Sequence, residues 1–460
     1  MAHLRYNIVD LKEKYPEKFG RFVMALKNLI NSDDWGRICG IHGNTFNPND
    51  AGVKCPTDPD TVTKIGETGE PFYCKHSVYA FIAWHTPYVY QFELLLNKHN
   101  KSSNTDYITL PWIDLTDFTV DFTFMNDPEI TIFYDRKQIT TENPLAGAYY
   151  YVDGRRTRTT REGFLTPTNK KQRIQLNTVK KQLNDALYAM TYERFSSNPP
   201  KKAQGIVVNY VPLESPHNSL HDIIGGESGN MSCINISAFD PIFWLHHCNM
   251  DRHYYSWTYM ITDHFKQPLY PELMTDATYN HPCAPFYKDY VYATDFRYYK
   301  WGWQNNTNKY MSVSDVLDLK RYPYRYDIIK PAPFVGTTSF VELIDIPIPR
   351  ETIEFNVYLH LKDTVLNRDT NFAGSAVWFG INRDTTDCCR CNTALTNIKI
   401  DIEEYVTENG ITSVNFDDYV MTLEGRGRLI KDANNKYKVY SLRDLIKGGS
   451  YAIVLAGKEV

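Results

Sequence analysis

The chain has 460 residues, and its 50 Lys and Arg residues nearly balance its 54 Asp and Glu residues, which gives a formal charge of −4. This balance argues against nucleic acid as the main partner, because phosphate binding needs a basic surplus. Hydrophobic residues make up 42% of the chain and charged residues 23%, which is typical of a globular protein and excludes a disordered one. The nine cysteines are too few for a disulfide scaffold, and an odd number cannot all pair.

Hydrophobic periodicity predicts four helices in the first 260 residues. Residues 17–31 form the first, because apolar residues recur there at steps of three and four behind a proline. Similar patterns predict a second helix over residues 77–98 and a fourth over residues 242–260. The third is short, over residues 216–224, and a pair of glycines ends it. We expect residues 119–213 to be a long irregular segment inserted on a helical core.

The pattern changes after a Pro-Ala-Pro run near residue 332. Apolar and other residues alternate along 352–361, again along 397–403 and at the end of the chain along 451–455, which is typical of β-strands. The sequence therefore predicts an α+β multidomain protein. A mainly helical domain is expected over residues 1–332, and a β-sandwich-like domain over residues 333–460.

Two neighbouring helices carry histidines that could hold a metal. His217 and His221 are four positions apart, so a helix places them on one face, where they offer a two-point metal grip. The alternative is a pair of capped or surface histidines. The doublet His246-His247 lies in an apolar helix, where buried imidazoles are costly unless their nitrogens are occupied.

The N-terminal half offers a second trio of imidazoles. His76 and His85 are nine positions apart and point to opposite sides of a straight helix, so His76 must lie on the approach loop if both bind one ion. His42 could complete the trio from a separate loop. All-imidazole sites suit copper and zinc and argue against magnesium, calcium or a di-iron site. Cys74 is either a buried structural cysteine or a thiol that ligates copper or bonds covalently to an imidazole.

Three stretches that carry these histidines, residues 73–88, 213–226 and 238–252, resemble the coupled dicopper proteins. These are the tyrosinases, catechol oxidases and molluscan haemocyanins, and the chain is most similar to intracellular fungal-type tyrosinases. The family pattern implies one copper bound by His42, His76 and His85 and a second copper bound by His217, His221 and His247. The resemblance also implies a central four-helix bundle around the copper pair.

Other residues receive roles from the same resemblance. His246 matches a group that supports the ligands without binding copper, and Cys74 matches the cysteine that forms a thioether with the second histidine of the first site, here His76. Two positions depart from the family pattern. Thr86 stands where an arginine is usual, and Asn230 stands where a histidine is usual.

The resemblance implies that the chain hydroxylates monophenols at the ortho position and oxidises o-diphenols to o-quinones with O2. The expected partners are O2 and a small phenolic or catecholic substrate. Glu214 and Asn218 match residues that hold a water poised to deprotonate a monophenol, although Glu214 could instead cap its helix. The alternatives are a catechol oxidase without monophenolase activity and, from a different class, a haemocyanin-like O2-binding protein.

The C-terminal domain resembles the lid that keeps fungal-type tyrosinases latent. Phe379 is expected as the aromatic side chain that such a lid inserts into the substrate pocket, with Trp378 as the neighbouring alternative. Cys388 and Cys391 match a Cys-x-x-Cys pair associated with copper loading, and the alternative is a buried or zinc-binding pair. An activating protease and a homo-oligomer are left open.

The chain shows neither a signal-peptide-like start nor 18 consecutive apolar residues. We therefore expect a cytoplasmic protein without a membrane partner.

Overall fold

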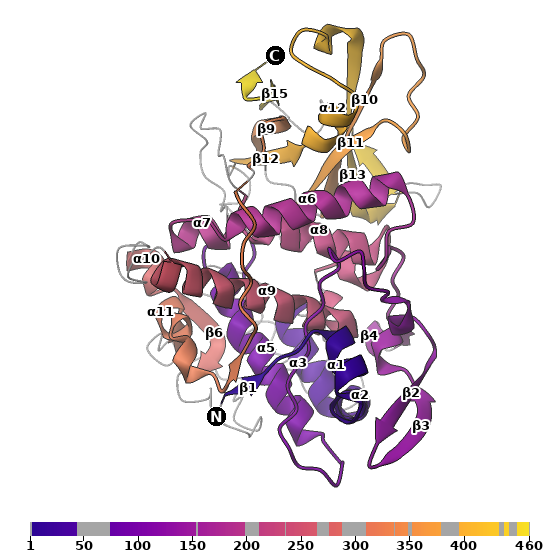
Figure 1. Ribbon diagram of the computed structural model, residues 1–460, viewed down its shortest axis with the longest axis vertical. Coiled ribbons are helices and arrows are strands. Elements are labelled where there is room, and N and C mark those ends of the chain that lie inside the picture. The colour runs from indigo at the N-terminus through magenta and orange to yellow at the C-terminus, as the bar shows by residue number, and fades with distance from the viewer. Residues whose placement is uncertain are drawn as a thin grey trace. The chain divides into compact units, whose positions relative to one another are not determined.

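A computed structural model gives the fold. It describes residues 2–43, 74–152, 155–197, 211–234, 236–264, 276–287, 310–334, 336–347, 352–378, 395–431, 437–440 and 449–459. These residues form a mixed helix and sheet protein (Figure 1). None of the helices among them is long and apolar enough to cross a bilayer.

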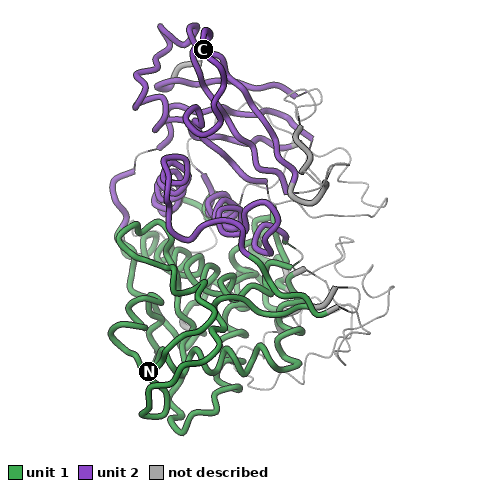
Figure 2. Tube along the Cα trace, turned by 90° about the vertical axis from the view of Figure 1, so that its right-hand side faces the viewer, with its two compact units in different colours: residues 1–160, 190–196, 234–330 green, residues 161–189, 197–233, 331–460 purple. Residues whose placement is uncertain are grey.

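The chain divides into two compact units (Figure 2). The first comprises residues 1–160, 190–196 and 234–330, and the second comprises residues 161–189, 197–233 and 331–460. The sequence-based division at residues 332 and 333 stays a prediction.

The first unit is mainly helical. Its helices are α1 (Ile8–Lys14), α2 (Pro16–Ile30), α3 (Asp33–Gly43), α5 (Phe81–Lys98), α7 (Tyr192–Ser196), α9 (Pro241–Tyr259), α10 (Asp276–Tyr279) and α11 (Val313–Leu317). Its strands form small two-stranded sheets: β1 (His3–Leu4) with β8 (Tyr324–Arg325), β2 (Glu129–Tyr134) with β3 (Lys137–Glu142), β4 (Tyr149–Val152) with β5 (Arg155–Arg158), and β6 (Pro282–Tyr287) with β7 (Tyr310–Ser312).

Local sequence explains where these helices begin and how closely they pack. Pro16 opens α2, and Gly20 lets it approach β2 closely, because a Cβ at Gly20 would lie 2.0 Å from the carbonyl oxygen of Phe133. In α9, the Asp240 side chain caps the helix by accepting a hydrogen bond from the Ile242 N–H at 3.1 Å. Helices α5 and α9 pack against each other, and both carry candidate ligands.

The second unit joins two sheets to helices α6 (Lys170–Ala186), α8 (Glu214–Gly225) and α12 (Glu403–Glu408). One sheet has the order β11-β10-β13-β14 and the other β12-β9-β15-β16. The strands are β9 (Phe340–Pro347), β10 (Ile353–Leu361), β11 (Phe372–Trp378), β12 (Leu395–Asp401), β13 (Tyr419–Lys431), β14 (Tyr437–Tyr440), β15 (Ser450–Leu455) and β16 (Lys458–Glu459).

Side chains of both sheets share one apolar core, as in a β-sandwich. Phe355 and Val357 of β10 belong to it together with Val341 of β9 and Ile400 of β12. Helices α6 and α8 pack against each other and against β11 (Figure 1). Gly226 ends α8 in a left-handed conformation with φ +67°, and a Cβ there would lie 2.5 Å from the carbonyl carbon of Glu162.

The structure confirms the four predicted helices as α2, α5, α8 and α9 and the three predicted strands as β10, β12 and β15. The expectation of an irregular segment over residues 119–213 was wrong. Helix α6, two hairpins and α7 lie there. Helix α6 buries Ile174, Val179 and Leu183 along one stripe among many polar residues, and such a sparse stripe is easily overlooked.

Candidate metal centre

Four buried side chains of the first unit form one possible metal group: His42, Cys74, His76 and His85. Each offers one ligand atom, and these atoms all lie within 4.8 Å of one another. His76 lies on the loop before α5 and His85 within α5, as predicted. His42, however, lies in helix α3 and not on a loop. The sequence did not predict this helix, because its 11 residues include three glycines, and glycine is unfavourable in a helix interior.

The three imidazoles of this group surround a common point. Their ring centroids lie 5.7 Å apart for His42 and His76, 5.7 Å for His42 and His85, and 5.4 Å for His76 and His85. No pair of these rings is stacked, because the planes meet at 83°, 54° and 58° respectively. Such a nearly equilateral arrangement of rings is compatible with three ligands of one ion.

Backbone carbonyls orient two of these rings. Nδ1 of His42 lies 3.0 Å from the carbonyl oxygen of Ile234, and Nδ1 of His85 lies 2.8 Å from that of Phe81. A carbonyl oxygen only accepts, so Nδ1 carries the proton, and in the neutral form of the imidazole the lone pair is then on Nε2. A hydrogen bond at the second nitrogen is the usual way in which a protein fixes a metal-binding histidine.

The thiol of Cys74 lies against the same rings. Its Sγ atom is 3.1 Å from Nδ1 of His76 and 3.5 Å from Nε2 of His85. The side chain is buried. The structure therefore places the Cys74 thiol in close contact with His76. The covalent bond between them stays a prediction.

A second set of candidate ligands consists of four buried histidines, namely His217 and His221 on α8 of the second unit and His246 and His247 on α9 of the first. Nδ1 of His221 lies 2.9 Å from the carbonyl oxygen of Met231, which again leaves the lone pair on Nε2. Burial lowers the pKa of His221 to about 4, so its imidazole is neutral near pH 7.

Both members of the histidine doublet belong to the second group. The His247 ring stacks on His85 at a centroid distance of 4.5 Å, and the His246 ring lies 5.2 Å from that of His247. The assignment of His247 as ligand and His246 as its support stays a prediction.

Glu214 and Asn218 are both buried and lie one turn apart on α8. The Glu214 carboxylate accepts a hydrogen bond from the Ser197 hydroxyl. The Asn218 Oδ1 atom is 2.8 Å from Nδ1 of His217, so the amide adjoins a candidate ligand. Glu214 also lies in the first turn of its helix, where the helix dipole favours a carboxylate.

The residues proposed for the lid are only partly described. Trp378 ends β11, and its half-buried ring packs against the core of its own sandwich. Phe379, Cys388 and Cys391 lie outside the described residues.

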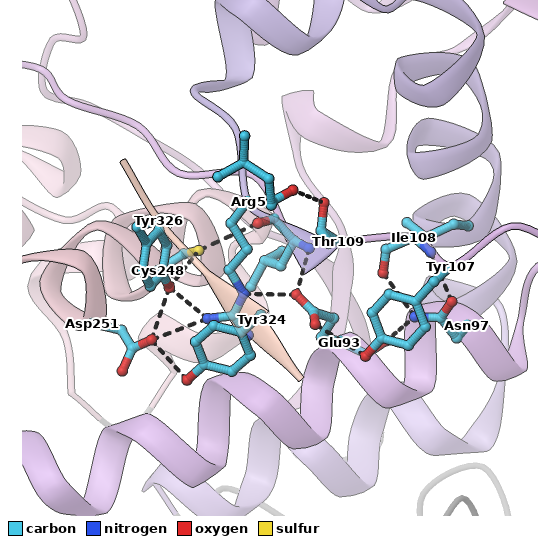
Figure 3. A network of polar contacts seen from close by, with 12 residues as sticks. Arg5, Glu93, Asn97, Tyr107, Ile108, Thr109, Cys248, Asp251, Tyr324 and Tyr326 are labelled. Atoms are coloured by element: carbon cyan, nitrogen blue, oxygen red, sulfur yellow. Dashed lines mark hydrogen bonds and ion pairs between the residues drawn. The ribbon is translucent and has the colours of Figure 1, made fainter. Parts of the chain in front are cut away.

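Sequence reasoning missed a buried network beside the first group (Figure 3). The Arg5 guanidinium pairs with Glu93 at 2.7 Å and with Asp251 at 3.1 Å. The Thr86 hydroxyl, directly after His85, donates to the other oxygen of Asp251 at 2.7 Å. Asp251 lies four residues after His247 on α9, so it joins the two helices that bear these histidines. No local pattern marks Arg5 as the cation of this network.

The donors present fit copper. Both groups consist of imidazole nitrogens, with one thiol in the first, and carbonyl partners at Nδ1 leave Nε2 of several rings as the nitrogen that can bind a metal. Such a soft to borderline donor set suits copper or zinc.

Comparisons with known proteins agree with this centre. Residues 32–260 match the family model described as the common central domain of tyrosinase. The tyrosinase of Neurospora crassa is 28% identical over 313 residues, which cover 58% of this chain and 44% of that protein. Haemocyanin 1 of Megathura crenulata is 26% identical over 333 residues, which cover 70% of this chain and 8% of that protein.

Solved structures show the same fold. A pro-tyrosinase of Aspergillus oryzae, solved as a mutant, matches with a TM-score of 0.65 at 17% identity, and the match covers 100% of this chain and 94% of that one. The chain spans about half the length of the tyrosinases and polyphenol oxidase that it matches. The chain is a relative of the tyrosinases and carries their common central domain over residues 32–260.

Proposed function

We propose that the chain is a copper-dependent oxidase of small phenols and catechols, with two copper ions as cofactors and O2 as the oxidant. The observation that carries the proposal is the pair of buried metal groups built from imidazoles and one thiol. Copper, when bound, supplies the redox chemistry that couples O2 to the oxidation of a phenol. The names of the matched tyrosinases support the substrate class.

The proposed ligands are the six histidines that the resemblance assigns, in two trios: His42, His76 and His85, and His217, His221 and His247. In this account the carbonyl partners of His42, His85 and His221 keep those rings neutral and fixed in orientation. His246 would support the second trio from outside.

Cys74 is proposed to form a thioether with His76. The reaction would join Sγ to a ring carbon with loss of two hydrogens, which O2 accepts as the oxidant. Two observations support it, namely the 3.1 Å contact and the position of His76 on a loop that no helix holds in place.

Hydroxylation of monophenols is proposed to use Glu214 and Asn218 as a general base acting through one water. Both side chains are buried on one helix beside a candidate ligand, and Ser197 orients the carboxylate. Glu214→Gln should then lower the turnover of tyrosine by about 100-fold or more, the usual worth of a general base, while catechol oxidation changes little. Glu408→Gln, at an exposed ion pair with Lys170, is the matched control.

Two other functions remain as alternatives. A catechol oxidase would oxidise catechol but leave tyrosine untouched, and equal effects of Glu214→Gln on both substrates would contradict the base assignment. The match to a molluscan haemocyanin favours the second alternative, a carrier that binds O2 reversibly and turns over neither substrate.

The proposal also covers the arrangement of the histidine-bearing helices and the role of the C-terminal sandwich. We propose that the helices bearing the histidines form a central four-helix bundle and that the C-terminal sandwich acts as a lid that keeps the enzyme latent. The match to a pro-tyrosinase over the whole chain supports it. Limited proteolysis near residues 330–350 should then raise the turnover of catechol and tyrosine, and unchanged turnover after cleavage would contradict latency.

The cytoplasmic location stays a prediction, tested by cell fractionation.

A further inference from the structure

A small cavity of the first unit lies beside the N-terminal strand. Its volume is about 60 Å³, and nine residues line it, from the segments 3–6, 11–21 and 107–109. Three of them carry basic side chains, namely His3, Lys18 and Arg21, and none of the nine is acidic. The cavity is therefore positive, and nothing in the proposed oxidation uses it.

The Arg21 side chain is the strongest evidence for a ligand. It is only 2% exposed, and its one hydrogen bond among the described residues runs to the backbone carbonyl of Asp106, at 2.6 Å. Its Nε atom is buried, and no acceptor in the described part of the chain reaches it. A buried cation without a carboxylate partner is costly. Since Arg21 lines the cavity, an anion there would remove this cost.

Asp135 does not take the place of such an anion. Asp135 is the acid whose pKa Arg21 helps to lower, but Arg21 ranks last among the causes, after the hydrogen bonds from Ser102 and Ser103. Asp135 does not line the cavity. Its carboxylate is therefore engaged elsewhere.

Other groups around the cavity also favour an anion. Lys18 lies one turn before Arg21 on α2, and its ammonium lies 5.2 Å from the ring centre of Tyr6. Lys18 is in the first turn of a 15-residue helix, where the helix dipole is positive. The His3 ring stacks on the Tyr107 ring at a centroid distance of 4.4 Å, and both residues line the cavity.

We propose that this cavity binds a small oxyanion, such as inorganic phosphate, with Arg21 and Lys18 as its charged partners. A water occupies about 30 Å³ in the liquid, so the cavity admits a compact ion but not a nucleotide. The lining residues His3 and Leu4 directly precede Arg5, whose side chain enters the buried network. The bound anion would thus tie the N-terminal segment to α2.

Thermal unfolding of the purified full chain tests the proposal. Inorganic phosphate should raise the midpoint in a saturable way, because a ligand of the folded state stabilises it, whereas sodium chloride at the same ionic strength should not. Arg21→Met should weaken phosphate binding about tenfold or more, since it removes a charge-assisted hydrogen bond. Lys14→Met, which removes an exposed cation outside the cavity, should leave the phosphate response unchanged.

Several outcomes would overturn the site. Equal shifts with phosphate and chloride, or a full phosphate response in Arg21→Met, would leave only a general salt effect. Should Arg21→Met fail to fold, Lys18→Met removes the exposed partner instead, and calorimetric titration with phosphate should then show weaker binding than in the unaltered chain. Unchanged binding in Lys18→Met would contradict the assignment.

Discussion

Arg5 is the cation of a fully buried network, and its replacement by methionine is the sharpest test of how the first unit is held together. The side chain has no exposed surface, and its guanidinium lies 2.7 Å from Glu93 and 3.1 Å from Asp251. The ring centre of Tyr324 lies 3.3 Å from the same group. Arg5→Met keeps much of the apolar stem but leaves two buried carboxylates without their cation.

The expected loss is large. Removing one partner of a buried ion pair costs about 3–5 kcal/mol, because the remaining charge stays buried and uncompensated. Burial already raises the pKa of Asp251, and Arg5 opposes this shift. Without Arg5, uptake of a proton by Asp251 would relieve part of the cost, so we expect the free energy of unfolding to fall by about 3–5 kcal/mol and not by the sum of two broken pairs.

Urea unfolding of the full chain measures this loss. Lys12→Met is the control, because it removes a cation that lies 5.0 Å from the ring centre of Phe124 and outside the network. The double variant Arg5→Met/Glu93→Gln should lose less free energy of unfolding than the two single variants lose together, because both single substitutions break the same ion pair. A loss for Arg5→Met below about 1 kcal/mol, close to that of an exposed ion pair, would show that Arg5 does not compensate the two buried carboxylates.

Two further predictions concern an acid-sensitive contact and the proposed crosslink. Hydrogen bonds from His99 and Lys98 lower the pKa of Asp34 from 3.8 to about 2, so the stability that Asp34 adds is present above pH 3.8 and is lost as the pH falls toward 2. The advantage of the unaltered chain over Asp34→Asn in urea should therefore be constant near neutral pH and shrink below about pH 4, and an advantage that grows there would contradict the account. Mass spectrometry of the copper-loaded chain should find the peptides of Cys74 and His76 lacking two hydrogens, and Cys74→Ser should restore the ordinary mass. Ordinary mass before substitution would exclude the thioether.

Much of the local structure followed from the sequence. The spacing of apolar residues located α2, α5, α8 and α9, because one buried face at a 3.6-residue period marks a helix. The nine-residue spacing of His76 and His85 placed one on a loop and one on a helix, since a single straight helix cannot point both at one ion.

What the sequence could not reveal depends on long-range packing. Arg5 and Asp251 are 246 positions apart, and no periodicity links them. Thr86 looked only like a departure from the family pattern, yet its hydroxyl meets Asp251. Helix α6 was overlooked because most of its residues are polar, and its stripe is buried against other parts of the second unit. Arg21 gave no signal at all, since only the fold reveals that its charge is buried beside a cavity.

The metal content of the copper-loaded chain tests the central claim most directly. We expect two copper ions per chain and O2 uptake that depends on added catechol, and we expect His221→Ala to hold close to one copper and to lose the O2 uptake. A fully loaded chain with zinc in its place, or with no more than one metal ion, would contradict the account.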